Sequence, residues 1–145
     1  MKILMVCLGN ICRSPLAHGV LEHMVDASGL GWEIDSAGTG NWHVGEAPDR
    51  RSIAIAKKYG VDISSQCCRQ FRQQDFDHYD RIYVMDHNNY QDVLRQARTD
   101  RDRKKVALFL RDDVVPDPYY DDLQFDSVYR MIEKRCRELI EDELT

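Results

Sequence analysis

The sequence predicts an α/β protein with a four-stranded parallel sheet and helices on both faces. Short apolar segments alternate with amphipathic ones along the 145 residues, in the order β-α-β-α-β-α-β-α. Strands that alternate with helices pair in parallel through right-handed crossovers, and ligands bind at the carboxyl ends of such strands. A chain of this length is typical of one domain, so we expect a single domain over residues 1–145.

Each element follows from its periodicity and from the residues that end it. The predicted strands are residues 2–7, 32–35, 80–85 and 105–110. The predicted helices are residues 14–27, 50–59, 87–97 and 124–143. Asp49 and Asp86 are expected N-caps, and Gly29 is the expected stop of the first helix.

Composition excludes several classes of protein. The formal net charge is −5, which argues against a general nucleic-acid surface, and the adjacent Arg50 and Arg51 are interpreted as a solvated helix face. Five cysteines in no secreted framework predict reduced thiols and a cytoplasmic location. No apolar run reaches membrane-spanning length, so we expect no membrane partner.

The stretch VCLGNICRSP follows the first predicted strand and leaves five residues between Cys7 and Arg13. Backbone N–H groups of such a turn can point inward, and the next helix adds its positive end, so the turn favours an anion. Gly9 and Asn10 tolerate left-handed backbone, and Ser14 followed by proline is typical of a helix N-cap. The stretch predicts a phosphate-binding loop after strand 1.

The thiol of this loop is the candidate nucleophile. An ordinary thiol is only about 3% ionised at pH 7, and a helix N-terminus beside an arginine lowers its pKa by several units. The planar guanidinium of Arg13 matches two phosphate oxygens. Cys7 alone could be a small core residue, but the anion-binding turn around it favours the functional interpretation.

A second candidate segment, VVPDPYY, follows the fourth predicted strand. It is expected at the same sheet edge as Cys7, because both follow parallel strands. Asp117 lies between two prolines and could protonate a departing phenolate oxygen, a step worth about 10²–10⁴-fold. Read alone, Asp117 could be a turn residue, and Tyr119, Tyr120 and Trp42 could be packing residues. Their joint presence favours a pocket for an aromatic ring.

These motifs closely resemble those of the low-molecular-weight protein tyrosine phosphatases. The likeness covers VCLGNICRSP, IDSAG at 34–38, NWHVG at 41–45, VMD at 84–86 and DPYY, in this order over nearly the whole chain. It implies one phosphatase domain over residues 1–145 that hydrolyses phosphotyrosine in proteins or peptides and needs no cofactor. Inorganic phosphate and vanadate are expected inhibitors.

The resemblance also implies residue roles. Cys7 takes the phosphoryl group as nucleophile, Arg13 binds it, and Asp117 protonates the leaving oxygen and then activates water. The remaining residues of the expected phosphate and ring site are Leu8, Gly9, Asn10, Ile11, Cys12, Ser14, Trp42, Tyr119 and Tyr120.

Within that site, the resemblance assigns Asn10 and Ser14 to holding the loop and stabilising the thiolate. It assigns Cys12 to trapping an oxidised Cys7 as a disulfide. Gln66 stands where the family commonly has a histidine. Glutamine forms hydrogen bonds but carries no charge, so we expect the loop network to persist with a weaker hold on Asn10.

Three other functions stay open. A thiol-coupled arsenate reductase shares the loop but needs two further cysteines spaced as a relay, whereas Cys67 and Cys68 are adjacent and Cys136 lies on a helix face. A phosphoarginine phosphatase would need a pocket that selects a guanidinium. A non-catalytic phosphate-binding module would need neither a nucleophile nor an acid. No spacing of histidines or cysteines predicts a metal site.

Overall fold

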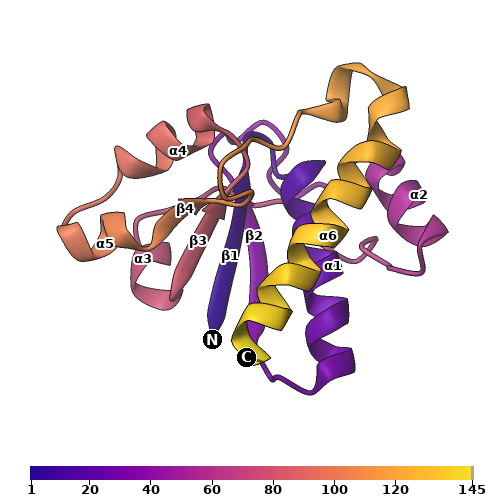
Figure 1. Ribbon diagram of the computed structural model, residues 1–145. Helices are drawn as coiled ribbons and strands as arrows, with labels where there is room; N and C mark the ends of the chain where they lie inside the picture. The colour runs from indigo at the N-terminus through magenta and orange to yellow at the C-terminus, as the bar shows by residue number, and fades with distance from the viewer. Residues whose placement is uncertain (145) are drawn as a thin grey trace.

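A parallel sheet between two layers of helices forms the molecule, as described by a computed structural model for residues 1–144 (Figure 1). The sheet order is β2-β1-β3-β4, and all three pairings are parallel. The strands are β1 (Lys2–Cys7), β2 (Glu33–Gly38), β3 (Arg81–Val84) and β4 (Val106–Leu108). The predicted fold class is confirmed.

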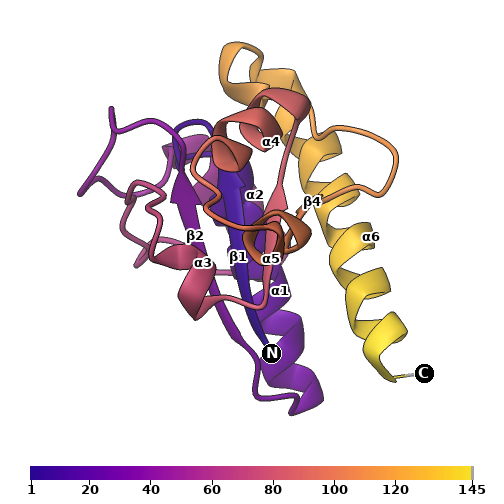
Figure 2. The ribbon, with the colours of Figure 1, turned by 90° about the vertical axis from the view of Figure 1, so that its left-hand side faces the viewer.

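Helices lie on both sides of the sheet (Figures 1 and 2). One side carries α1 (Arg13–Ser28), α2 (Arg50–Lys58) and α6 (Phe125–Leu144). The other side carries α3 (Asp75–His78), α4 (His87–Leu94) and α5 (Asp100–Lys104). None of these helices, within residues 1–144, has the length and apolar character needed to cross a membrane.

Strand β1 is buried on both of its faces, which explains its continuous apolar sequence. Ile3 and Met5 pack into the core beneath α1 and α6. Leu4 and Val6 pack into a second core on the side of α3 and α4. Strand β1 pairs with β3 as far as Val6 and with β2 as far as Cys7, so the backbone that leads to Cys7 is held from both sides.

Several predicted boundaries differ from the structure. Strand β2 continues through Gly38, beyond the predicted end at Asp35, because its last residues pair with the end of β1. Strand β4 is shorter than residues 105–110, and α4 ends at Leu94 rather than near residue 97. Helices α3 and α5 were not predicted, since four or five residues carry no helical repeat of apolar side chains.

Three predicted helix ends, at Asp49, Asp86 and Gly29, are confirmed. The side chain of Asp49 accepts from the amide of Arg51 at the start of α2, and that of Asp86 accepts from the amide of Asn89 at the start of α4. Gly29 ends α1 with a left-handed φ of 68°. The loops that follow β1, β2, β3 and β4 all lie at one edge of the sheet (Figure 1), and Asp49 and Asp86 lie in the loops after β2 and β3.

Candidate active site

The turn between β1 and α1 is tight and contains one left-handed residue. Asn10 has a φ of 57°, the only positive φ of a non-glycine residue among residues 1–144. Gly38 of β2 lies directly against this turn: a Cβ there would be 2.9 Å from the carbonyl oxygen of Leu8 and 3.0 Å from the amide nitrogen of Asn10. A glycine in β2 therefore allows the strand to approach the loop.

The thiol of Cys7 is buried at the base of this turn. Its Sγ lies 3.0 Å from Oγ of Ser14, which also accepts a hydrogen bond from Nδ2 of Asn10 at 2.8 Å. The prediction that Ser14 caps α1 is wrong, because the helix begins at Arg13 and the cap residue is Cys12, which makes no side-chain cap. The Ser14 hydroxyl instead faces the thiol, where it can stabilise a negative charge on sulfur.

A segment around residue 68 supports the turn from outside. Sγ of Cys68 donates to the carbonyl oxygen of Asn10 at 2.8 Å, and the amide of Arg69 donates to Oδ1 of Asn10 at 3.0 Å. Gln66 donates to the carbonyl of Pro15 at 3.1 Å and forms no bond to Asn10. Asn10 is therefore held by Cys68 and Arg69, two residues that were not predicted for the site, and the expected effect of Gln66 stays a prediction.

Burial raises the pKa of the Cys68 thiol to about 11, with neighbouring Cys7 and Cys67 adding to the effect. Cys68 therefore keeps its proton at neutral pH, as a hydrogen-bond donor must. Burial likewise raises the pKa of Cys12 to about 12, with Asp49 the next contributor. All five cysteines are unpaired.

Arg13 is oriented by two groups from other loops. Its Nη1 donates to Oδ2 of Asp86 at 2.7 Å and to the carbonyl of Val115 at 3.0 Å, and only 3% of the residue is exposed. Burial opposes its charge, but Cys7 and Asp86 outweigh that penalty and raise the pKa of Arg13. A permanent cation is therefore fixed beside the thiol.

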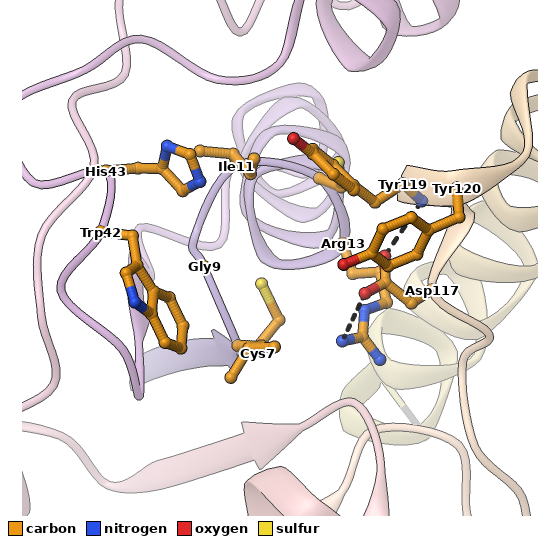
Figure 3. A pocket seen from close by; sticks show the side chains of 11 residues that line it. Cys7, Gly9, Ile11, Arg13, Trp42, His43, Asp117, Tyr119 and Tyr120 are labelled. Carbon is orange, nitrogen blue, oxygen red and sulfur yellow. Dashed lines mark hydrogen bonds and ion pairs between the residues drawn. The ribbon is translucent and has the colours of Figure 1, made fainter.

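Asp117 faces this cation from the loop after β4 (Figure 3). Its Oδ2 lies 3.7 Å from Nη2 of Arg13, and its Oδ1 accepts from the amide of Tyr119 at 3.1 Å. The amide of Val115 donates to the carbonyl of Met85 at 2.8 Å, which ties the loop to the end of β3. The carboxyl group thus reaches the rim above Cys7, where the sequence places it.

These groups converge on a pocket of about 270 Å³. Trp42 and His43 stand on one side, Tyr119 and Tyr120 on the opposite side, and Cys7 lies at the base (Figure 3). The complete lining is Cys7, Leu8, Gly9, Ile11, Cys12, Arg13, Trp42, His43, Asp117, Tyr119 and Tyr120.

The pocket contains all the predicted site residues except two. Asn10 and Ser14 are buried behind it and act through the loop. His43 was not predicted for the site, although it lies next to Trp42 in the loop between β2 and α2. Its Nδ1 pairs with Oε2 of Glu46 at 2.5 Å. Nowhere in residues 1–144 do three His, Cys, Asp or Glu side chains gather closely enough to hold a metal ion.

The family model for low molecular weight phosphotyrosine protein phosphatases matches residues 2–145. The chain belongs to this family. The matched range includes the turn between β1 and α1, Arg13 and the loop that carries Asp117. The resemblance drawn from the sequence motifs is confirmed.

Known members of the family cover the chain almost completely. The low molecular weight phosphotyrosine protein phosphatase of Sus scrofa is 34% identical over 97% of this chain and 94% of its own length. The crystal structure of a protein tyrosine phosphatase from Entamoeba histolytica matches with a TM-score of 0.90 and 34% identity, over 97% of this chain and 94% of that one. The crystal structure of a Drosophila arginine phosphatase matches with a TM-score of 0.91 and 31% identity, over 100% of this chain and 99% of that one.

Proposed function

We propose that this protein tyrosine phosphatase hydrolyses phosphotyrosine in proteins through a phosphocysteine intermediate. The sulfur of Cys7 attacks phosphorus while the bond to the tyrosine oxygen breaks, and Asp117 donates its proton to that oxygen. Water then attacks the phosphorus of the phosphocysteine while Asp117 takes a proton from that water. The P–S bond breaks, its electron pair returns to the sulfur of Cys7, and phosphate leaves. The observation that carries the proposal is the convergence of a thiol, a buried guanidinium and a carboxyl group on one pocket.

Arg13 has a separate part in both steps. Because Asp86 and Val115 occupy its Nη1, its Nη2 is the group that faces the pocket and Asp117. A phosphoryl group above Cys7 would accept from Arg13 and from inward N–H groups of the loop. Charge that develops on the equatorial oxygens is stabilised by donors already in position, which is the main catalytic term in phosphoryl transfer.

The aromatic walls support an aromatic leaving group. Trp42 and Tyr119 stand on opposite sides of the pocket, where they could hold a phenyl ring above the thiol (Figure 3). The likeness to an arginine phosphatase favours phosphoarginine as a second candidate substrate. Initial rates on matched peptides with phosphotyrosine, phosphoarginine or phosphoserine separate the two, and we expect phosphotyrosine to be hydrolysed fastest.

We also infer that the chain acts as one catalytic domain without metal or cofactor, since nucleophile, cation and acid all come from its own side chains. Inorganic phosphate and vanadate should compete for the loop. A cytoplasmic location would keep Cys7 and Cys12 reduced. Nucleic acids and membranes are not expected partners of a chain with net charge −5.

Two substitutions test the mechanism. Cys7→Ser should abolish turnover yet retain vanadate binding. Asp117→Ala should lower kcat/KM for a phosphotyrosine peptide by about 10²-fold or more but kcat/KM for p-nitrophenyl phosphate much less, because nitrophenolate leaves without a proton. The matched control is Asp112→Ala, an exposed acid of the same loop. Equal losses on both substrates for Asp117→Ala would remove that residue as the acid.

A further inference from the structure

Arg51, in the first turn of α2, connects three separate parts of the molecule. Its Nε and Nη2 donate to the two carboxylate oxygens of Asp49 at 3.0 and 2.9 Å. Its Nη1 donates to Oδ1 of Asp122 at 2.5 Å. Only 26% of the side chain is exposed, so the prediction that Arg51 belongs to a solvated face is wrong, whereas it holds for its exposed neighbour Arg50.

The same guanidinium lies over two aromatic rings. Its central carbon is 5.3 Å from the ring centroid of Tyr119 and 4.7 Å from that of Phe125. Cations at this distance are attracted to the face of a ring. Arg51 thus contacts the segment that carries Asp117 at two points, through the ring of Tyr119 and the carboxylate of Asp122.

The other end of this connection reaches the phosphate loop. The amide of Asp49 donates to the carbonyl oxygen of Ile11 at 2.8 Å. A continuous series of contacts therefore runs from Ile11 through Asp49 and Arg51 to Asp122. The Arg51 guanidinium therefore joins the two halves of the active site at their outer side, whereas Arg13 joins them inside the pocket through the carbonyl of Val115.

Apart from the buried Pro118, the segment from Pro116 to Gln124 is largely exposed. Tyr120 is 89% exposed and Leu123 is 90% exposed, and the helical turns there bond mainly within the segment. Within residues 1–144, the carboxylate of Asp117 has one hydrogen bond, from the amide of Tyr119, and one ion pair, with Arg13 at 3.7 Å. Without a tie to α2, little would fix the height of the carboxyl group above the thiol.

We propose that Arg51 is a positioning residue for leaving-group protonation. It holds residues 117–122 against α2, so that Asp117 reaches the departing oxygen and Tyr119 borders the ring. This inference rests on the proposed function, in which Asp117 is the acid. An arginine is required because its planar fork binds both oxygens of Asp49 while a third nitrogen reaches Asp122, and a lysine ammonium cannot do both.

The test compares two substrates in three variants: Arg51→Ala, Arg51→Lys and the control Arg50→Ala. For Arg51→Ala we expect kcat/KM for a phosphotyrosine peptide to fall about tenfold, while kcat/KM for p-nitrophenyl phosphate falls about twofold, as for partial loss of general acid catalysis in the first step. Arg51→Lys should behave like Arg51→Ala, and Arg50→Ala like wild type. Thermal unfolding of each variant reports its folding.

A purely structural role would predict a different result. Equal losses on both substrates, in a variant that melts as a folded protein, would overturn the inference. If Arg51→Ala does not fold, Asp122→Ala removes the carboxylate contact of Arg51 with residues 117–122 and leaves its contact with the Tyr119 ring. It should show the same preference for the better leaving group, and equal losses there would also overturn the inference.

The double variant Arg51→Ala/Asp117→Ala distinguishes failure of this inference from failure of the proposed function. If Arg51 acts through Asp117, substituting Arg51 in the Asp117→Ala background should change the ratio of kcat/KM between the two substrates by less than about twofold. If Asp117→Ala alone shows no leaving-group preference, the proposed function fails. If Asp117→Ala shows the preference and Arg51→Ala does not, only the inference about Arg51 fails.

Discussion

Cys68 offers a direct test of how the phosphate loop is supported. In Cys68→Ala the carbonyl oxygen of Asn10 loses its donor, and an unsatisfied buried acceptor costs about 1–3 kcal/mol. A thiol is a weak donor, so the lower half of that range applies, and the small cavity left by sulfur adds to it. We expect the free energy of unfolding to fall by about 2 kcal/mol, measured by urea denaturation.

The same change should weaken anion binding. Asn10 positions the hydroxyl of Ser14 beside Cys7, so a looser Asn10 must be ordered again when the loop closes around an oxyanion. If about 1 kcal/mol of the lost support must be recovered on binding, the inhibition constant for vanadate rises about fivefold. Inhibition of p-nitrophenyl phosphate hydrolysis by vanadate measures it.

The neighbouring cysteine supplies the control. Cys67 is exposed, and within residues 1–144 its thiol makes a single long hydrogen bond, to the carbonyl of Cys68 at 3.9 Å. Cys67→Ala should therefore leave both unfolding and vanadate inhibition unchanged. Cys68→Ser keeps a donor at the site and should recover most of the loss. Cys68→Ala and Cys67→Ala with indistinguishable unfolding curves and inhibition constants would refute the reasoning.

Four further outcomes are expected. Asp86→Ala should lower kcat/KM more than about tenfold by freeing Arg13, and Asp86→Asn less so, because an amide can still accept from the guanidinium; equal kcat/KM for wild type and Asp86→Ala would contradict this. Vanadate should raise the melting temperature of the wild type but not that of Gly38→Ala, since the added Cβ would clash with the backbone of the phosphate-binding loop. Burial raises the pKa values of Cys12, to about 12, and Cys136, so both stay protonated when folded. Unfolding therefore releases their protons above about pH 9, and each should lower the urea-derived stability by about 1.4 kcal/mol from pH 8 to pH 10. Excess chelator should leave the rate unchanged, and a loss restored by added metal would contradict the metal-free mechanism.

The sequence indicates those parts of the fold whose cause is local. The apolar run of β1 predicts a buried strand, and Asp49, Asp86 and Gly29 mark helix ends through bonds to residues a few positions away. The strand-and-helix alternation then brings Asp117 to the edge that carries Cys7. The four- and five-residue helices α3 and α5 lack such a local pattern, and they escape prediction.

The parts of the site that escape prediction depend on contacts distant in sequence. Cys68 bonds to a residue 58 positions away, and Arg51 pairs with Asp122 across 71 positions. Nothing near Cys68 distinguishes it from Cys67, and nothing near Arg51 distinguishes it from Arg50. Only the folded chain shows which member of each pair faces inward.

Strand β1 lies in the interior of the sheet, whereas Asp117 follows β4, a three-residue strand at its edge. Edge elements open at lower free energy than central ones. Mild heat or denaturant should therefore impair release of the tyrosine product before it impairs capture of oxyanions. Vanadate binding would then be a poor measure of catalytic competence. An inhibitor screen that reports only the displacement of a bound oxyanion would count molecules with an open Asp117 loop as active.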